Sequence, residues 1–182
     1  MMLSFDPFPI LSTTRLRLRQ VAESDAPEIF FLRSDSRMMQ YLDRAPATSI
    51  TEALAHIQQV REIVEKGEGV YWAIELNDHP GLIGTIGFWR LQKAHYRAEI
   101  GYALHPDQQG KGLMQEALQE VLAFGFRTMG LHSVEANVNP NNTHSIRLLE
   151  KAGFVREGFF RENYYYNGQF LDSAIYSLVK PK

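Results

Sequence analysis

The sequence predicts a mixed α/β (α+β) fold in a single domain spanning residues 1–182. Apolar residues alternate in some segments, as in half-buried strands, and recur every three or four positions in others, as on one face of a helix. The two kinds of segment follow one another with no linker, repeat or low-complexity tract between them. A chain of 182 residues is long enough to bury a hydrophobic core in one domain.

The first elements are a strand and a helix. Residues 11–21 alternate apolar and basic side chains, which predicts a half-exposed edge strand. Residues 23–42 are expected to be helical, because Ser24 or Asp25 can serve as the N-cap and Pro27 falls in the first turn. The basic side chains of the strand, which either attract an acidic substrate or are simply solvated, are Arg15, Arg17 and Arg19.

The middle of the chain predicts a helix, a hairpin and a further strand. Helical spacing over residues 51–66 ends at a glycine. Residues 70–76 and 82–91 alternate as strands on either side of a turn at residues 77–81, which predicts a β-hairpin. Residues 97–104 alternate in the same way and predict the next strand.

The last part of the chain contains two helices and three strands. A helix follows residue 112 and runs to about Met129, since its apolar residues form one stripe. Residues 132–138 predict a strand, and residues 139–151 predict a helix for which Gly153 is the natural C′ residue. Residues 154–179 predict two strands around an Asn-Gly turn.

A glycine-containing loop separates the strand over residues 97–104 from the following helix. The stretch HPDQQGKGLMQEAL begins at His105 and contains two glycines and a lysine. Backbone N–H groups at a helix start have no intrahelical partner, and the positive end of the helix dipole lies behind them. The stretch therefore predicts either a phosphate site or a plain structural turn. Its spacing differs from that of a Walker A loop and from that of a dinucleotide-binding fingerprint.

A second polar cluster lies in the stretch NVNPNNTHSIRLLEKAGF. Asn137 and Asn139 end a strand, Pro140 lies where a helix begins, and Asn142 and Ser145 share one face of that helix. Taken alone, the asparagines predict helix capping. Taken with the glycine loop, the arrangement resembles the GNAT superfamily of N-acetyltransferases.

The resemblance covers residues 14–179. The family's acetyl-CoA loop has the pattern Gln/Arg-x-x-Gly-x-Gly/Ala, which falls here on Gln109–Met114, with methionine in place of the last small residue. That departure is common in the Rim-type subgroup, which acetylates the N-termini of ribosomal proteins. The segments TTRLRLRQVAESDA, EIGYALHP, LLEKAGFVREG and YYYNGQFLDSAIYSLV are also similar to that subgroup.

The resemblance implies the GNAT fold: a central, twisted, mostly antiparallel mixed sheet of about seven strands, flanked by helices, with two splayed parallel strands at its centre. Acetyl-CoA is the implied cosubstrate, held without a metal by backbone amides at its pyrophosphate and by the splayed strands at its pantetheine. Glycine is expected at positions 110 and 112, because a Cβ would keep the backbone away from the phosphate oxygens. Lys111 either adds a charge-assisted contact or is solvated. The implied cofactor-binding residues are Leu104, Gln109, Gly110, Lys111, Gly112, Leu113, Met114, Asn137 and Asn142.

The resemblance also implies two catalytic residues. Acyl transfer needs a neutral amine, and an α-amino group, with a pKa of about 7.7–8.0 against about 10.4 for lysine, needs only a modest base. Glu99 is the implied base, directly or through a water, and Ser145 or a tyrosine is the implied acid for the departing thiolate. The alternatives are a solvent-facing strand carboxylate at position 99 and a capping or exposed serine at position 145.

Composition excludes several classes of protein. A formal net charge of -2 gives no general attraction to nucleic acid or to an anionic membrane. The absence of cysteine excludes disulfides, thiolate zinc sites and a cysteine nucleophile, and the six histidines lack metal-ligand spacing. No apolar run reaches transmembrane length, and residues 1–10 lack the pattern of a signal peptide, so a cytoplasmic protein is expected.

The favoured function is acetyl transfer to a primary amine by direct attack in a ternary complex, with a protein N-terminus of the ribosomal-protein type as acceptor. Two alternatives stay open: a small amine (an antibiotic, polyamine or amino acid) as acceptor, and a non-catalytic acyl-CoA-binding regulatory domain. An enclosed pocket rich in carboxylates would favour a polycation, and an open groove beside the Trp72–Trp89 hairpin would favour a peptide. The chain is expected to be a monomer or a homodimer.

Overall fold

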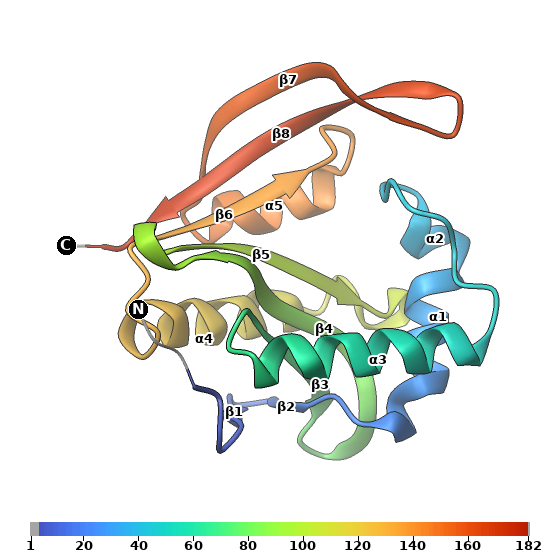
Figure 1. Ribbon diagram of the computed structural model, residues 1–182, viewed down its shortest axis with the longest axis vertical. Helices are drawn as coiled ribbons and strands as arrows, with labels where there is room; N and C mark the ends of the chain where they lie inside the picture. Colours follow the sequence, from blue (N-terminus) through green and yellow to red (C-terminus); the bar gives the residue numbers. More distant parts are fainter. Residues whose placement is uncertain (1–3, 182) are drawn as a thin grey trace.

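Figure 1 shows a twisted sheet with helices on both faces and a long hairpin rising at one end. This computed structural model describes residues 4–181, so residues 1–3 and 182 of the expected domain lie outside the described residues. The strands are β1 (Leu11–Ser12), β2 (Leu16–Gln20), β3 (Val70–Leu76), β4 (His79–Gln92), β5 (Arg97–Leu104), β6 (Ser133–Val138), β7 (Val155–Tyr166) and β8 (Gln169–Val179). Their order in the eight-stranded sheet is β1-β2-β3-β4-β5-β6-β8-β7.

The helices cover the two faces of this sheet. They are α1 (Ala26–Ser34), α2 (Ser36–Met39), α3 (Ile50–Glu65), α4 (Leu113–Arg127) and α5 (Thr143–Lys151), with 3-10 turns η1 (Glu23–Asp25), η2 (Lys93–His95) and η3 (Pro106–Gln108). Helices α1 and α3 form one buried cluster with Ala73 and Leu82, whereas the apolar stripe of α4 joins a larger core around Trp72 and Ile86. Between residues 4 and 181, no helix is both long enough and apolar enough to cross a membrane.

The expected edge strand over residues 11–21 is wrong, because the segment forms two strands. The N–H of Thr13 donates to the carbonyl oxygen of Leu16 (2.8 Å), and the Thr13 hydroxyl accepts from the Leu16 N–H (3.0 Å), which turns the chain. β2 then pairs with both β1 and β3, so β1 is the edge strand. This division gives the sheet eight strands instead of about seven.

The helix expected over residues 23–42 is interrupted. Asp35 adopts an extended backbone (φ -62°, ψ 131°), and its carboxylate accepts from the Arg37 N–H (2.9 Å), so α2 begins as a new helix. Asp25 directly precedes α1, as expected, but its carboxylate binds Arg19 instead of an amide of the first turn. A side chain that competes for backbone amides thus ends the helix early.

The helix expected over residues 139–151 begins later than its sequence pattern indicates. Asn142 caps it by accepting from the Ser145 N–H (3.1 Å), so α5 starts at Thr143. Its C-terminal end agrees with the prediction, since Gly153 follows with a φ of 92°.

The two central strands diverge, as the resemblance implies. β5 and β6 pair in parallel only at Arg97–Ser133, Ala98–Val134 and Glu99–Glu135, among the residues that the structure describes. Beyond these pairs, β5 follows β4 to Leu104 and β6 follows β8 to Val138. The facing edges of the two strands therefore part at the centre of the sheet.

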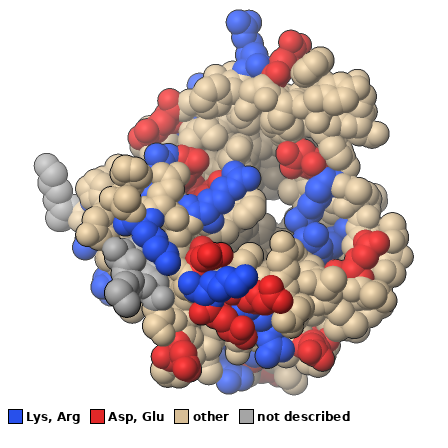
Figure 2. Space-filling model, viewed as in Figure 1, with Lys and Arg blue, Asp and Glu red and all other residues tan. Residues whose placement is uncertain are grey.

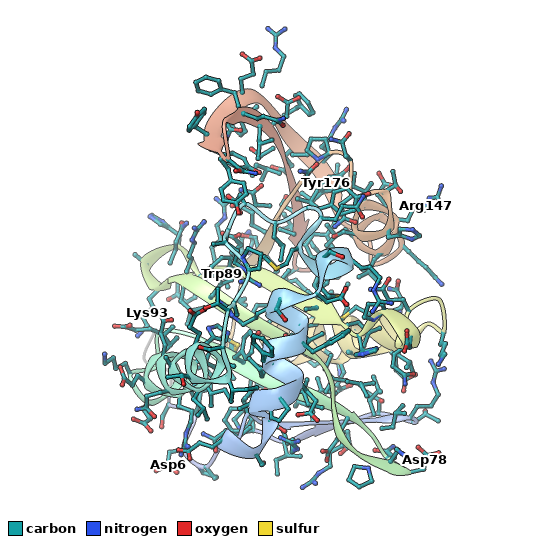
Figure 3. All side chains as sticks on the ribbon, turned by 90° about the vertical axis from the view of Figure 1, so that its right-hand side faces the viewer. Asp6, Asp78, Trp89, Lys93, Arg147 and Tyr176 are labelled. Carbon is teal, nitrogen blue, oxygen red and sulfur yellow. The ribbon has the colours of Figure 1, made fainter. Side chains whose placement is uncertain are left out.

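The β7–β8 hairpin extends beyond the rest of the sheet around the expected turn at residues 167 and 168. Figure 3 shows this hairpin at the top, α1 in front of the sheet, and Asp78, in the β3–β4 turn, at the opposite end of the molecule. In Figure 1 the tip of the hairpin and α2 lie at the same end of the molecule.

Candidate active site

The loop between β5 and α4 presents unpaired backbone amides. Gly110 and Gly112 have φ angles of 74° and 76°, a left-handed conformation that favours glycine, and Gly112 is the N-cap of α4. The first bond of α4 runs from the N–H of Glu116 to the carbonyl oxygen of Gly112 (3.1 Å). Within residues 4–181, no protein group accepts from the amides of residues 110–114. This is the geometry of an anion site at a helix start.

The other residues predicted for the loop hold it in place. Gln109 Nε2 donates to the carbonyl oxygen of Leu104 (3.0 Å), which ties the loop to the end of β5. Lys111 is exposed, and its Nζ donates to Gln108 Oε1 (3.0 Å). The side chains buried in the core below the loop are those of Leu113 and Met114. A methionine is tolerated at the last motif position because its side chain packs inward.

An anchor that the sequence reasoning missed fixes the loop from outside. Arg15 Nη1 donates to the carbonyl oxygen of Lys111 (2.9 Å), while its Nε and Nη2 lie 2.7 Å from Glu116 Oε2. Because the peptide unit is planar and trans, a Lys111 carbonyl turned towards Arg15 directs the Gly112 N–H the opposite way. The other arginines of the series are also ion-paired, Arg17 with Glu75, and Arg19 with Glu75 and Asp25.

A hydroxyl pair links β5 to α5, the helix that follows β6. Tyr102 on β5 and Ser145 on α5 are hydrogen-bonded, with 2.7 Å between their oxygens. Burial raises the pKa of Tyr102 to about 12, against the opposing effect of the bond to Ser145, so the phenol keeps its proton at neutral pH. The resemblance implied Ser145 or a tyrosine as the acid, without singling out Tyr102. The pair is able to supply a proton where the strands separate.

Glu99 lies on the opposite face of β5 from Tyr102, as strand alternation requires. Its side chain is buried and accepts from Arg90 Nη1 (3.0 Å). Burial raises the pKa of Glu99, and the charge of Arg90 opposes this shift. The carboxylate lines a cavity of about 120 Å³ together with Arg97 and Glu135. The alternative of a solvent-facing strand carboxylate is therefore wrong.

A larger cavity, of about 260 Å³, lies between the segment after α1 and the β7–β8 hairpin. Figure 2 shows the hollow below the hairpin, with basic side chains on both sides of it. The lining residues are Met39, Gln40, Tyr41, Leu42, Arg44, Pro46, Asn139, Tyr166, Asn167, Gln169 and Leu171. Among the described residues that line it, Arg44 alone is charged. Because Asn139 follows β6, this cavity reaches the end of one of the two parting strands.

The predicted asparagines lie in different surroundings. Asn142 caps α5, so its carbonyl oxygen is already engaged. Asn137 is exposed on β6, and Asn139 lines the larger cavity.

The groove expected beside the Trp72–Trp89 hairpin is not the larger cavity. Trp72 is fully buried and Trp89 is 45% exposed, and neither residue lines either cavity.

Comparison with known proteins identifies the family. The family model described as "Acetyltransferase (GNAT) domain" matches residues 15–155. The chain belongs to the GNAT acetyltransferase family. It is an acetyl-CoA-dependent N-acetyltransferase.

Three similar proteins illustrate the GNAT relationship. "Uncharacterized N-acetyltransferase YoaA" from Bacillus subtilis is 41% identical over 175 residues, covering 96% of this chain and 99% of the relative. The [ribosomal protein uS5]-alanine N-acetyltransferase of Escherichia coli is 30% identical over 128 residues, covering 70% and 66%. The solved structure of RimL, a ribosomal L7/L12 alpha-N-protein acetyltransferase in complex with coenzyme A, superposes with a TM-score of 0.85 at 25% identity, covering 94% and 98%.

The loop residues of this GNAT enzyme fit a diphosphate. Two left-handed glycines leave the backbone without side chains on the loop, and the free amides match the acceptor oxygens of phosphate. Acetyl-CoA supplies the acetyl group as a thioester. Within residues 4–181, no three His, Cys, Asp or Glu side chains converge as a metal site.

Proposed function

We propose that this GNAT enzyme acetylates the α-amino group of a protein N-terminus, of the ribosomal-protein type. The observation that carries the proposal is the larger cavity, which lies at the end of β6 and is lined by no carboxylate among the described residues. A polyamine carries several positive charges that need counter-charges, whereas the end of a polypeptide presents one amine that must be neutral to react. The names of the uS5 and L7/L12 acetyltransferases support the same acceptor class.

In the proposed mechanism, the amides of residues 110–114 bind the pyrophosphate, and Arg15 orients the loop. Glu99 removes a proton from the amine through a water, since its cavity and the larger one share no lining residue. The amine nitrogen forms a bond to the acetyl carbon as the carbon–sulfur bond breaks. The Tyr102–Ser145 pair then supplies a proton to the departing sulfur.

A thiol-release assay tests the acceptor class directly. The enzyme is given acetyl-CoA with peptides bearing free N-termini, with polyamines and with aminoglycosides, and mass spectrometry locates the acetyl group. We expect acetylation at the peptide α-amine and little at polyamines. Efficient acetylation of a polyamine or an aminoglycoside, with peptides left unmodified, would overturn the proposal.

The variant Glu99→Gln is expected to lower kcat on the order of 10²-fold near pH 6.5 while acetyl-CoA affinity is unchanged. The pKa of Glu99 is raised from its ordinary value, so the wild-type base becomes available as pH rises through that pKa, and the variant lacks this limb. The loss should shrink near pH 9, where the α-amine, with a pKa of about 7.7–8.0, is already neutral. Full pH–rate profiles of both proteins check this, and coincident profiles would remove Glu99 from the mechanism.

The variant Arg15→Ala is expected to raise the acetyl-CoA Kd about tenfold with little change in kcat at saturation, because the loop loses a charge-assisted bond to the Lys111 carbonyl. Arg17→Ala is the matched control, since the two side chains are 47% and 49% exposed and each pairs with a glutamate. Isothermal titration of both variants measures the difference. Equal affinities in the two variants would contradict the anchoring role.

A further inference from the structure

The inference concerns Arg44, which lines the larger cavity, and Arg33, which lies close enough to feel its charge; it rests on the proposed peptide acceptor. Arg44 lines the cavity in the segment after α2. Arg33 lies in the last turn of α1, and its carbonyl oxygen accepts from the Ala47 N–H (2.8 Å), which holds residues 44–47 against α1. The backbone thus brings the two cationic residues together beside the proposed acceptor site.

Neither guanidinium is neutralised by the protein. Among the described residues, no carboxylate lies within ion-pair distance of Arg33 or Arg44, whereas Arg15, Arg17 and Arg19 all have such partners. Arg33 is half-buried, and both burial and the charge of Arg44 lower its pKa. Two like charges held together in a partly desolvated place cost free energy unless an anion joins them.

The surrounding titratable groups offset this positive charge only in part. Glu52 attracts Arg33, but its carboxylate already accepts from the Thr48 N–H (3.0 Å) and hydroxyl (2.6 Å). His56 on α3 has its pKa lowered to about 4 by burial and by the two arginines, so at neutral pH it is uncharged. Tyr71, edge-on to the His56 ring, is half-buried, and its raised pKa keeps it neutral; Asp43 is exposed next to Arg44.

We propose that Arg33 and Arg44 form an anion site that binds a carboxylate of the acceptor, so that the preferred substrate is a peptide with Asp or Glu within its first few residues. The arginine fork matches a carboxylate in a bidentate arrangement. The cavity, at about 260 Å³, is near the lower end of ligand pockets and suits the end of a chain. In this arrangement the acceptor's amine points towards the parting strands β5 and β6, while its acidic side chain stays beside Arg33 and Arg44.

Three peptides that differ only at residues 2 and 3 (Ser-Asp-Asp, Ser-Asn-Asn and Ser-Lys-Lys, each followed by the same neutral sequence) test the inference. We expect kcat/KM for the acidic peptide to exceed that for the amide peptide at least about tenfold, with the gap narrowing as salt is added. Arg44→Glu reverses the charge at an exposed position and should reverse this order of kcat/KM values in favour of the lysine peptide.

 Arg33→Met, which keeps the apolar part of the side chain, should raise the KM for the acidic peptide alone.

The control is Arg61→Glu, which reverses a charge on α3 at a side chain that lines neither cavity and whose Nη1 lies 3.9 Å from Glu23 Oε1. This variant should keep the wild-type preference, and the KM for acetyl-CoA should stay constant in all the variants. Equal rates for the acidic and amide peptides, or an unchanged preference in Arg44→Glu, would overturn the inference and leave the proposed function standing. Free amino acids acetylated in place of every peptide would overturn both.

Discussion

Replacing Gly112 by glutamate is expected to abolish acetyl-CoA binding, with a rise in Kd of more than about 100-fold. A Cβ at this position would lie on the loop, 3.6 Å from Arg15 Nη2, and the added carboxylate would compete with phosphate for the free amides. Isothermal titration with acetyl-CoA measures the loss. Wild-type affinity in a folded Gly112→Glu protein would contradict the assignment of the loop.

The matched control for this variant is Gly130→Glu. Gly130 has a φ of 71°, close to the 76° of Gly112, but it follows the other end of α4, and a Cβ there meets nothing within 4 Å. Each substitution pays the same left-handed backbone penalty, about 1–2 kcal/mol. The two variants should therefore lose similar thermal stability, while only Gly112→Glu loses the ligand.

Removing one hydroxyl from the Tyr102–Ser145 pair is expected to lower kcat on the order of 10²-fold, with little change in the KM for acetyl-CoA. Tyr102→Phe removes the partly buried phenol hydroxyl, and Ser145→Ala removes its partner, 2.7 Å away. Because the two groups act as one donor, the double variant should be about as slow as either single variant. Steady-state rates with a saturating acceptor measure all three.

Tyr176→Phe serves as the control for this pair. Tyr176 is a buried tyrosine on β8, 4% exposed, and lies outside the loop and both cavities. The Tyr176→Phe variant should keep the wild-type kcat. This result would show that a fall in kcat in Tyr102→Phe comes from the loss of a proton donor and not from the loss of any tyrosine hydroxyl. A loss of kcat in the double variant equal to the product of the two single losses would contradict the proposed proton transfer. A wild-type kcat in Tyr102→Phe would also contradict it.

The sequence predicts most of this fold because local patterns decide it. The stripe that begins at Met114 is buried against the sheet, and the divergence of β5 and β6 follows from the resemblance. The break in the first strand was missed because a single threonine, Thr13, competes for the backbone of Leu16. The break between α1 and α2 has the same kind of cause at Asp35. Such side-chain bonds leave hydrophobic periodicity unchanged, so a periodicity argument does not detect them.

The sequence predicts the part of the site whose residues are adjacent in the chain, and it misses the part that tertiary contacts assemble. The loop residues are adjacent in sequence, and a motif identifies them. Arg15 and Glu116 are 101 positions apart, and Arg33 and Arg44 meet only through the fold of the α1–α2 segment. Only tertiary structure brings these charges together.

Three pairs of residues join β5 to β6, whereas six join β6 to β8. The sheet thus consists of two parts, β1–β5 and β6–β8, that are joined by a short stretch of parallel pairing. The hydrogen bond between Tyr102 and Ser145 connects the two parts beyond this stretch. A ligand that lies between β5 and β6 contacts both parts of the sheet at once and opposes their separation. Occupancy of this site and the free energy of unfolding are consequently linked, since a ligand that binds only the folded chain stabilises it by mass action.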